Sequence, residues 1–209
     1  MKRLTLIISL LIAIAAPLKA STIEQLFLDE HAGVFNLLDR QARMIMLDNF
    51  KSGAKVPVSN NMEGDSSRIV ALSEREITVL TSPARQVQAR LLVNKRDSII
   101  IAVETVSTPY RDSRVTFYTT AWRRVPEADH IKPVPAITML YRSAMDANAQ
   151  AELDALAMPM MEMTLEDDRL ALRHSYKPQV TKEVYTKLEP KLFDVRYYQI
   201  DGLKLKLIK

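Results

Sequence analysis

Apolar and polar residues alternate along four consecutive stretches between residues 76 and 123. A period of two is typical of β-strands that bury one face. Short segments containing Pro or Asp separate the stretches, at residues 82–85, 95–97 and 108–112. The pattern therefore predicts a four-stranded antiparallel meander, around which we expect the rest of the chain to pack.

One strand register gathers the apolar residues of this meander on a single face. We expect Val93 to pair with Ile99, because cross-strand partners share a face and this choice brings Leu91 beside the isoleucines. A slip of one residue would move every side chain of a strand to the other face. The prediction is a sheet with one covered apolar face and one wetter, mixed face.

The wetter face is the candidate binding site. In the expected register it carries Arg90, Glu104, Tyr118 and Trp122. Aromatic residues with arginine are enriched at binding hot spots, so this face suits a protein or glycan partner. The loop at residues 108–112 is a second candidate. The alternative is that the second half of the chain packs on this face and buries Tyr118 and Trp122.

Helical periodicity is clearest at residues 34–51, with Gly53 just beyond the last periodic residue. Leu47 and Phe50 belong to the apolar positions of this segment, together with Met44 and Ile45, whereas Arg43 falls on the polar side. Shorter helices are expected at residues 144–157 and 181–188. Hairpins are expected at residues 160–176 and 192–208, the second around Asp201-Gly202.

These elements predict an α+β fold, with helices packed on antiparallel sheet in two successive helix-plus-meander halves. The proline-containing stretch at residues 125–135 is the best boundary between the halves. We expect residues 21–125 to form a helix plus a four-stranded meander. Residues 136–209 are expected to form a helix plus two hairpins, either as a separate domain or as one domain with the first half.

Residues 1–20 have the order of a secretory signal peptide: Lys2 and Arg3, an apolar stretch, and a plausible cut after Ala20. The alternative is an uncleaved amphipathic anchor. The chain has 29 Lys and Arg against 25 Asp and Glu, but loss of Lys2, Arg3 and Lys19 leaves 26 against 25. We therefore expect an exported protein, periplasmic or extracellular, with no basic surface for nucleic acid and no membrane span in the mature chain.

The residue types give little support for catalysis. The chain has no Cys, and its histidines, His31, His130 and His174, are widely separated. Methionines cluster around Met160, which suits either soft-metal binding or adaptable core packing, and we favour the latter. Acidic residues are available, but nothing in the sequence brings two of them together. We expect no cofactor and no metal.

Three segments carry a resemblance to a known family: the helix at residues 37–48, the hairpin at residues 97–115, and the closing hairpin at residues 197–205. Together they resemble an uncharacterised family of small exported proteins of unknown function from Bacteroidetes. The resemblance implies export and an α+β domain, and it supplies no activity and no site residues.

The leading hypothesis is an exported, non-catalytic binding or interaction protein of the cell envelope. The first alternative is an envelope hydrolase with a carboxylate-based site between the two halves. The second is a structural subunit of a larger envelope assembly.

Overall fold

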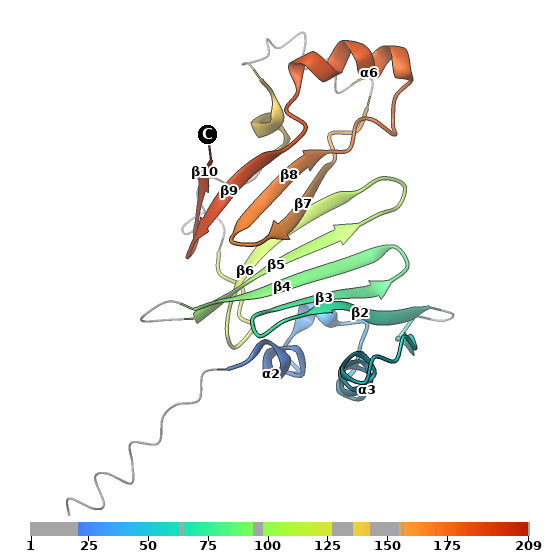
Figure 1. Cartoon of the computed structure of the whole chain (residues 1–209), viewed down its shortest axis with the longest axis vertical. Helices are drawn as coiled ribbons and strands as arrows, with labels where there is room; N and C mark the ends of the chain where they lie inside the picture. Colours follow the sequence, from blue (N-terminus) through green and yellow to red (C-terminus); the bar gives the residue numbers. More distant parts are fainter. Residues whose placement is uncertain are drawn as a thin grey trace, which may run out of the picture.

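Two antiparallel β-sheets form most of the protein in the computed structural model (Figure 1). The structure describes residues 21–208, apart from 63–64, 94–97, 127–135, 143–154 and 156. The larger sheet has six strands in sequential order: β1 (Val58–Ser59), β2 (Ser66–Leu72), β3 (Glu76–Ser82), β4 (Arg85–Val93), β5 (Ser98–Val106) and β6 (Asp112–Thr119).

The smaller sheet has four strands in the order β10-β9-β8-β7. Its strands are β7 (Met161–Glu166), β8 (Arg169–His174), β9 (Arg196–Asp201) and β10 (Lys204–Leu207). Short helices join or flank the strands: α2 (Ile23–Phe27), η1 (Gly33–Phe35), α3 (Arg40–Lys51), η2 (Ile137–Leu140), α6 (Lys182–Leu188) and η3 (Glu189–Lys191).

The expected α+β fold class is wrong. The protein is mostly β, because both sheets are antiparallel and the described helices are few and short. The expectation of two helix-plus-meander halves fails because the second half supplies a sheet, not a helix, to the second face of the six-stranded sheet. The helix expected at residues 144–157 lies almost wholly outside the described residues. The two C-terminal hairpins and α6 are confirmed.

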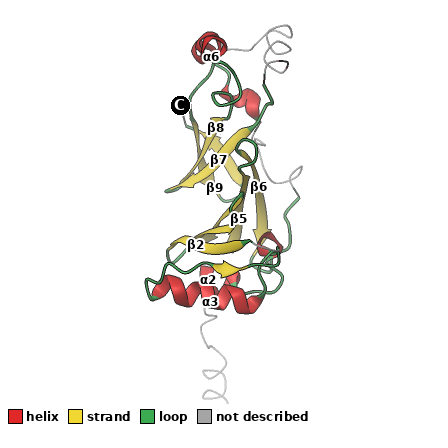
Figure 2. Ribbon diagram, turned by 90° about the vertical axis from the view of Figure 1, so that its right-hand side faces the viewer, coloured by secondary structure: helices red, strands yellow, loops and turns green. Residues whose placement is uncertain are grey.

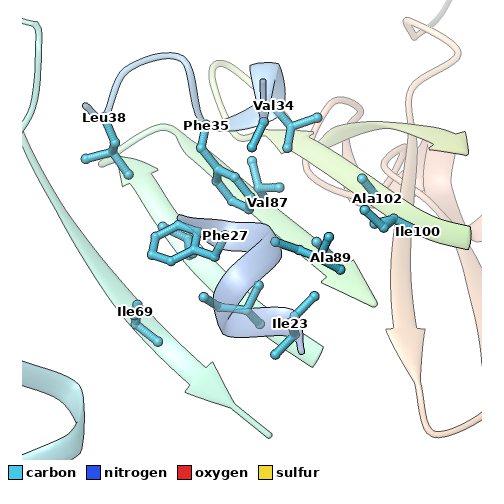
Figure 3. Packing of buried hydrophobic residues seen from close by; sticks show 14 of the residues in the cluster. Ile23, Phe27, Val34, Phe35, Leu38, Ile69, Val87, Ala89, Ile100 and Ala102 are labelled. Carbon is cyan, nitrogen blue, oxygen red and sulfur yellow. The ribbon is translucent and has the colours of Figure 1, made fainter. Parts of the chain in front are cut away.

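The two faces of the six-stranded sheet have different covers (Figure 2). One face carries Ile77, Val79, Val87, Ala89 and Ile100, and it packs against α2, η1 and α3. Figure 3 shows Phe27 and Phe35 of this N-terminal segment lying over Val87 and Ala89. Their rings meet edge to face at 4.9 Å, a favourable aromatic geometry.

The other face packs against the four-stranded sheet. Ile101, Val103, Val115 and Phe117 form one buried cluster with inward residues of β7, β8, β9 and β10, among them Leu172. Burial of apolar surface stabilises this contact by roughly 25 cal/mol per Å². The six-stranded sheet is therefore a central layer, with helices on one side and a second sheet on the other.

The observed register differs from the expected one between β4 and β5. Val93 pairs with Ser98 and Leu92 with Ile99, so that Ala89 lies opposite Ala102. Because the difference is one residue, the faces of β5 and β6 are exchanged relative to those of β3 and β4. Strand β5 is buried on both faces, so the apolar run Ile99–Ile101 is compatible with either register between β4 and β5.

Helix α3 begins later than expected and turns a different side to the core. Asp39 caps it by accepting a hydrogen bond from the Ala42 amide, and the chain before it forms the separate η1 turn. Met44 is exposed, whereas Arg43 is 4% exposed. The expectation that Arg43 is solvated is therefore wrong.

Candidate functional site

Trp122, expected on an open binding face, is part of the core under the helices. Its indole is 6% exposed, and Nε1 donates to the Leu26 carbonyl oxygen at 2.9 Å. The ring lies 6.0 Å from Phe35 and 5.4 Å from Tyr118. Its backbone φ of +56° lies in the left-handed region, which few bulky residues adopt. Burial and the indole hydrogen bond offset that strain.

Tyr118 and Glu104 lie on the same helix-covered face as Trp122. Tyr118 is half-buried, and burial, aided by the charge of Glu104, raises the pKa of the Tyr118 phenol. The Glu104 carboxylate accepts a hydrogen bond from Arg85 Nη2, which also donates to the Val34 carbonyl oxygen. Glu104 therefore helps to anchor the N-terminal segment to the sheet.

Arg90, the fourth predicted residue, lies on the opposite face of the sheet. Its partner in the β4–β5 ladder is Ile101, which packs against the four-stranded sheet. The structure thus brings Glu104, Tyr118 and Trp122 together, under the helices, and separates Arg90 from them. The exchange of faces between β4 and β5 is the physical reason.

Arg90 instead lines a cleft of about 830 Å³ whose lining residues come from both sheets. The turns of the β7–β8 and β9–β10 hairpins lie at the same end of the smaller sheet, on the left in Figure 1. The cleft has apolar walls, formed mainly by Leu92, Ile99, Ile200 and Leu203. Its charged residues come from both sheets: Arg75, Arg90, Asp167, Asp168, Asp201 and Lys204. A volume of this size suits a small organic ligand.

The guanidinium of Arg90 is deeply buried and incompletely paired. Its side chain is 10% exposed. Nε and Nη2 both donate to Glu76 Oε2, at 2.7 and 2.6 Å, whereas Nη1 has no hydrogen-bond partner. A buried donor left without an acceptor costs about 1–3 kcal/mol. An unpaired buried donor of this kind is uncommon in folded proteins.

Two of the acidic side chains of the cleft, those of Asp168 and Asp201, have lowered pKa values. A hydrogen bond from Gln199 Nε2 to Asp168, at 2.7 Å, is the main cause of the lowered pKa of Asp168, and nearby Arg169 and Arg90 contribute. A hydrogen bond from Lys206 likewise lowers the pKa of Asp201. Both carboxylates are exposed. The charges of both walls are largely paired within the protein, since Asp201 bonds Lys206 and Arg90 bonds Glu76.

Sequence reasoning did not bring Asp167, Asp168 and Asp201 together at one site. Asp167 and Asp168 were considered as available acids for a hydrolase and as turn residues, and Asp201 only as a turn residue. In an antiparallel meander, alternate turns lie at the same end of the sheet. That rule places the β7–β8 and β9–β10 turns side by side, and with it the sequence alone could have predicted that their acidic residues are neighbours. Their opposition to Arg90 depends on how the two sheets pack, which no local pattern shows.

Other candidate chemistry is sparse in the part of the chain that the structure describes. No group of three or more His, Cys, Asp or Glu side chains there is arranged to hold a metal ion. His31 is exposed and bonded to Asp29, while His174 is largely buried on β8. No described helix has the length and apolar character to cross a membrane.

Comparison with known proteins identifies a fold and a family. No curated protein matches the chain. A solved structure, described as a domain of an uncharacterized protein from Porphyromonas gingivalis W83, is 22% identical with a TM-score of 0.70. The match covers 89% of this chain and 98% of that one, and at this identity it shows a shared fold. The family model DUF3256, whose description is a protein of unknown function, matches residues 15–204, and the chain therefore belongs to that family.

Proposed function

We propose that the protein is an exported, non-catalytic binding protein of the cell envelope, and that the cleft between its sheets binds a small organic anion. The observation that carries this proposal is the cleft itself, whose lining combines apolar side chains of both sheets with the cationic residues Arg75, Arg90 and Lys204. A ligand carboxylate would pair with these cations, and charge-assisted hydrogen bonds are stronger than neutral ones.

The apolar walls indicate the rest of the ligand. Leu92 and Ile99 come from the larger sheet, and Ile200 and Leu203 from the smaller one. All four are only partly buried, so a hydrocarbon group placed between them would remove further apolar surface from water. A glycan is less suited, because the aromatic residues that suggested one, Tyr118 and Trp122, lie under the helices.

The lowered pKa values of two acidic residues favour binding over hydrolysis. A carboxylate hydrolase needs one acid with a raised pKa to protonate its leaving group. The pKa values of Asp168 and Asp201 are lowered instead, by their hydrogen bonds to Gln199 and Lys206. These carboxylates suit charge pairing with a ligand.

Export rests on the sequence of residues 1–20, with basic, apolar and cut-site regions in the order of a secretory signal. The absence of cysteine removes a lipid anchor on a cysteine that follows the cut. Mass spectrometry of the protein that accumulates in expressing cells tests this. Loss of residues 1–20 and recovery in the envelope or medium are expected, whereas an intact leader on cytoplasmic protein would contradict export.

The binding test compares 4-phenylbutyrate with its uncharged amide, 4-phenylbutyramide, by thermal shift. The acid should stabilise the protein and the amide should not, since a ligand at 100 times its Kd adds about 2.7 kcal/mol. Arg90→Gln should abolish the difference. Arg123→Gln, at an exposed arginine away from the cleft, is the matched control and should keep it. Equal stabilisation of Arg90→Gln and the unchanged protein by the acid would refute this site.

A further inference from the structure

A second pocket, which we call the α3–β2 pocket, lies between helix α3 and the edge of the larger sheet. Its volume is about 500 Å³, within the range of small-molecule sites. Three segments line it: the C-terminal half of α3, the connection at residues 53–56, and residues 68–70 of β2. It shares no lining residue with the cleft between the sheets.

The pocket exists because the chain leaves the sheet edge early. Strand β1 pairs two residues with β2, and continuation of that register would bring Val56 opposite Ile69. The next residue, Pro57, has no N–H to donate to such a ladder. The Val56 carbonyl oxygen instead accepts a hydrogen bond from Asn49 Nδ2 at 3.1 Å. The connection is therefore fastened to α3, and a gap remains beside β2.

Apolar side chains form most of this lining. Met46 and Ile69 are buried members of the core under the helices, and Phe50 packs against that core. Val56 and Val70 are 61% and 49% exposed. The ladder between β2 and β3 is irregular at Val70, and bulges of this kind commonly re-aim a side chain. A hydrocarbon group in the pocket would remove the surface of both valines from water.

The charged residues of the lining are both cations, Lys55 and Arg68. Both are exposed, and among the residues that the structure describes neither is bonded to a carboxylate. The C-terminal end of a helix disfavours an anion. Here the amides of Ser52 and Gly53 donate to carbonyl oxygens of the last turn of α3, which reduces that effect. The pocket thus combines an apolar interior with positive charge at the surface.

We infer that the α3–β2 pocket binds a single acyl chain with an anionic head group. The chain lies against Met46, Phe50 and Ile69, and the head group lies between Lys55 and Arg68. This site is independent of the proposed anion site in the cleft. Fatty acids and single-chain phospholipids share the required chemistry. An uncharged hydrocarbon would leave both cations without a partner, and a cationic amphiphile would be repelled by them.

The experiment titrates the protein with decanoate, below the concentration at which micelles form, and follows isotope-labelled methionine methyl groups by NMR. Met46 lines the pocket, whereas Met163 is buried between the two sheets. The variants Met46→Leu and Met163→Leu assign the two signals. The Met46 signal should shift in a saturable way, and a shift of Met163 alone would place the ligand elsewhere and overturn the inference.

A series of ligands separates the chain from the head group. Octanoate should bind about 10-fold more weakly than decanoate, because it buries two fewer methylene groups. Decanol should bind about 5-fold more weakly, since two exposed ion pairs are lost. A salt concentration of about 0.5 M should remove the advantage of decanoate over decanol. Decyl phosphate distinguishes the two sources of the ligand: tighter binding than decanoate indicates a phospholipid, and weaker binding a fatty acid.

Variants test the two cations directly. The double variant Lys55→Gln/Arg68→Gln should bind decanoate and decanol equally. The matched control is Arg123→Gln/Lys187→Gln, which removes two exposed cations outside the pocket and should keep the difference. Circular dichroism and the thermal midpoint check that each variant folds.

The apolar lip has its own test. Val70→Asp should weaken decanoate binding, because it places a negative charge beside the head group and removes apolar surface. Val106→Asp changes a valine of similar exposure, 46%, outside the pocket, and should have no effect. Equal binding by Val70→Asp and the unchanged protein would count against the site.

Failure of this inference is distinguishable from failure of the proposed function. Arg90→Gln, in the cleft, should leave the response of Met46 to decanoate unchanged, and loss of that response would overturn the assignment to the α3–β2 pocket. No shift of Met46, or equal affinity for decanoate and decanol, would also overturn it. Each of these results leaves the stabilisation by 4-phenylbutyrate, and its dependence on Arg90, to decide the proposed function.

Discussion

The two faces of the six-stranded sheet differ in how completely their buried polar groups are paired. Under the helices, Trp122 Nε1 donates to the Leu26 carbonyl and Glu104 accepts from Arg85. On the side of the four-stranded sheet, Gln88 accepts from the Leu165 amide, but Arg90 Nη1 is buried without a partner. Both ring nitrogens of His174, on β8, are also buried without partners. Among the described residues these are the only buried side-chain nitrogen or oxygen atoms left unpaired. Such groups usually need a functional explanation.

Two buried arginines, one on each side of the sheet, differ in their hydrogen bonding. Arg43 donates to the carbonyl oxygens of Phe27, Asp29, Phe35 and Leu38, at 2.8–3.2 Å. Arg43 therefore organises the N-terminal segment, and its guanidinium also lies 6.0 Å from the Phe27 ring centroid. The guanidinium of Arg90 has a single acceptor, Glu76. All three guanidinium nitrogens of Arg43 therefore donate to the protein, whereas Nη1 of Arg90 does not.

The largest predicted effect is loss of Arg43. The substitution Arg43→Met should destabilise the protein by about 3–5 kcal/mol, since it leaves buried carbonyl oxygens without donors and each costs about 1–3 kcal/mol. Urea unfolding followed by far-UV circular dichroism measures this. Arg40→Met is the control on the same helix, because Arg40 is exposed and bonds one carbonyl, of Leu28. A loss below 1 kcal/mol in Arg43→Met would mean that this segment is not held as described.

A smaller loss is expected at Trp122. The substitution Trp122→Phe should cost about 1.5–3 kcal/mol, from the cavity and from the unpaired Leu26 carbonyl. Trp122 is also the only tryptophan, so its fluorescence reports on the helix-covered face. Emission should be blue-shifted and protected from iodide in the folded protein. A red-shifted, readily quenched signal would show that the helices do not cover this face.

The sequence predicted local structure better than packing. The C-terminal hairpins and α6 were predicted because the signals for them are local: Asp201-Gly202 marks a turn, and the Thr181 side chain caps α6 in the structure. The face of β5 was not, because Ile99, Ile100 and Ile101 offer an apolar side in either register. The fold class failed for a related reason. Strands buried on both faces need two covers, and a sequence pattern does not say whether a cover is a helix or a sheet.

The candidate site shows the same limit. Arg90 was selected for its chemistry, yet its partners were wrong, because the register error moved Glu104 and Tyr118 to its face. Arg43 was assigned to solvent because charged residues are rarely buried unless paired. Its acceptors are backbone carbonyls of residues 27–38. Backbone acceptors of that kind carry no side-chain signature in the sequence.

Removal of Arg90 should cost less than removal of Arg43. The substitution Arg90→Met relieves the unpaired Nη1 donor but leaves Glu76 without its cation, and the Glu76 side chain is 25% exposed to water. We expect a loss of about 1–2 kcal/mol. The double variant Arg90→Met/Glu76→Met should recover most of it in a double-mutant cycle. A loss equal to that of Arg43→Met would mean that the two arginines contribute equally to stability, against this prediction.

The smallest predicted effect is a pH dependence at His174. Burial lowers the pKa of the His174 imidazole, and the charge of Asp194 partly opposes this. Because the folded pKa lies below the unfolded value, the unfolded state binds more protons, and stability is present above pH 6.5 and falls as the pH decreases. At most about 1 kcal/mol should be lost between pH 6.5 and 5.5.

The thermal midpoint measured across this range should fall for the unchanged protein and stay flatter in His174→Phe. The ring lies 5.6 Å from Tyr176 in a stacked arrangement, which Phe can retain. If His174→Phe lost the same stability on acidification, the unpaired nitrogens on this side would not influence folding. The contrast between the two faces would then rest on Arg90 alone.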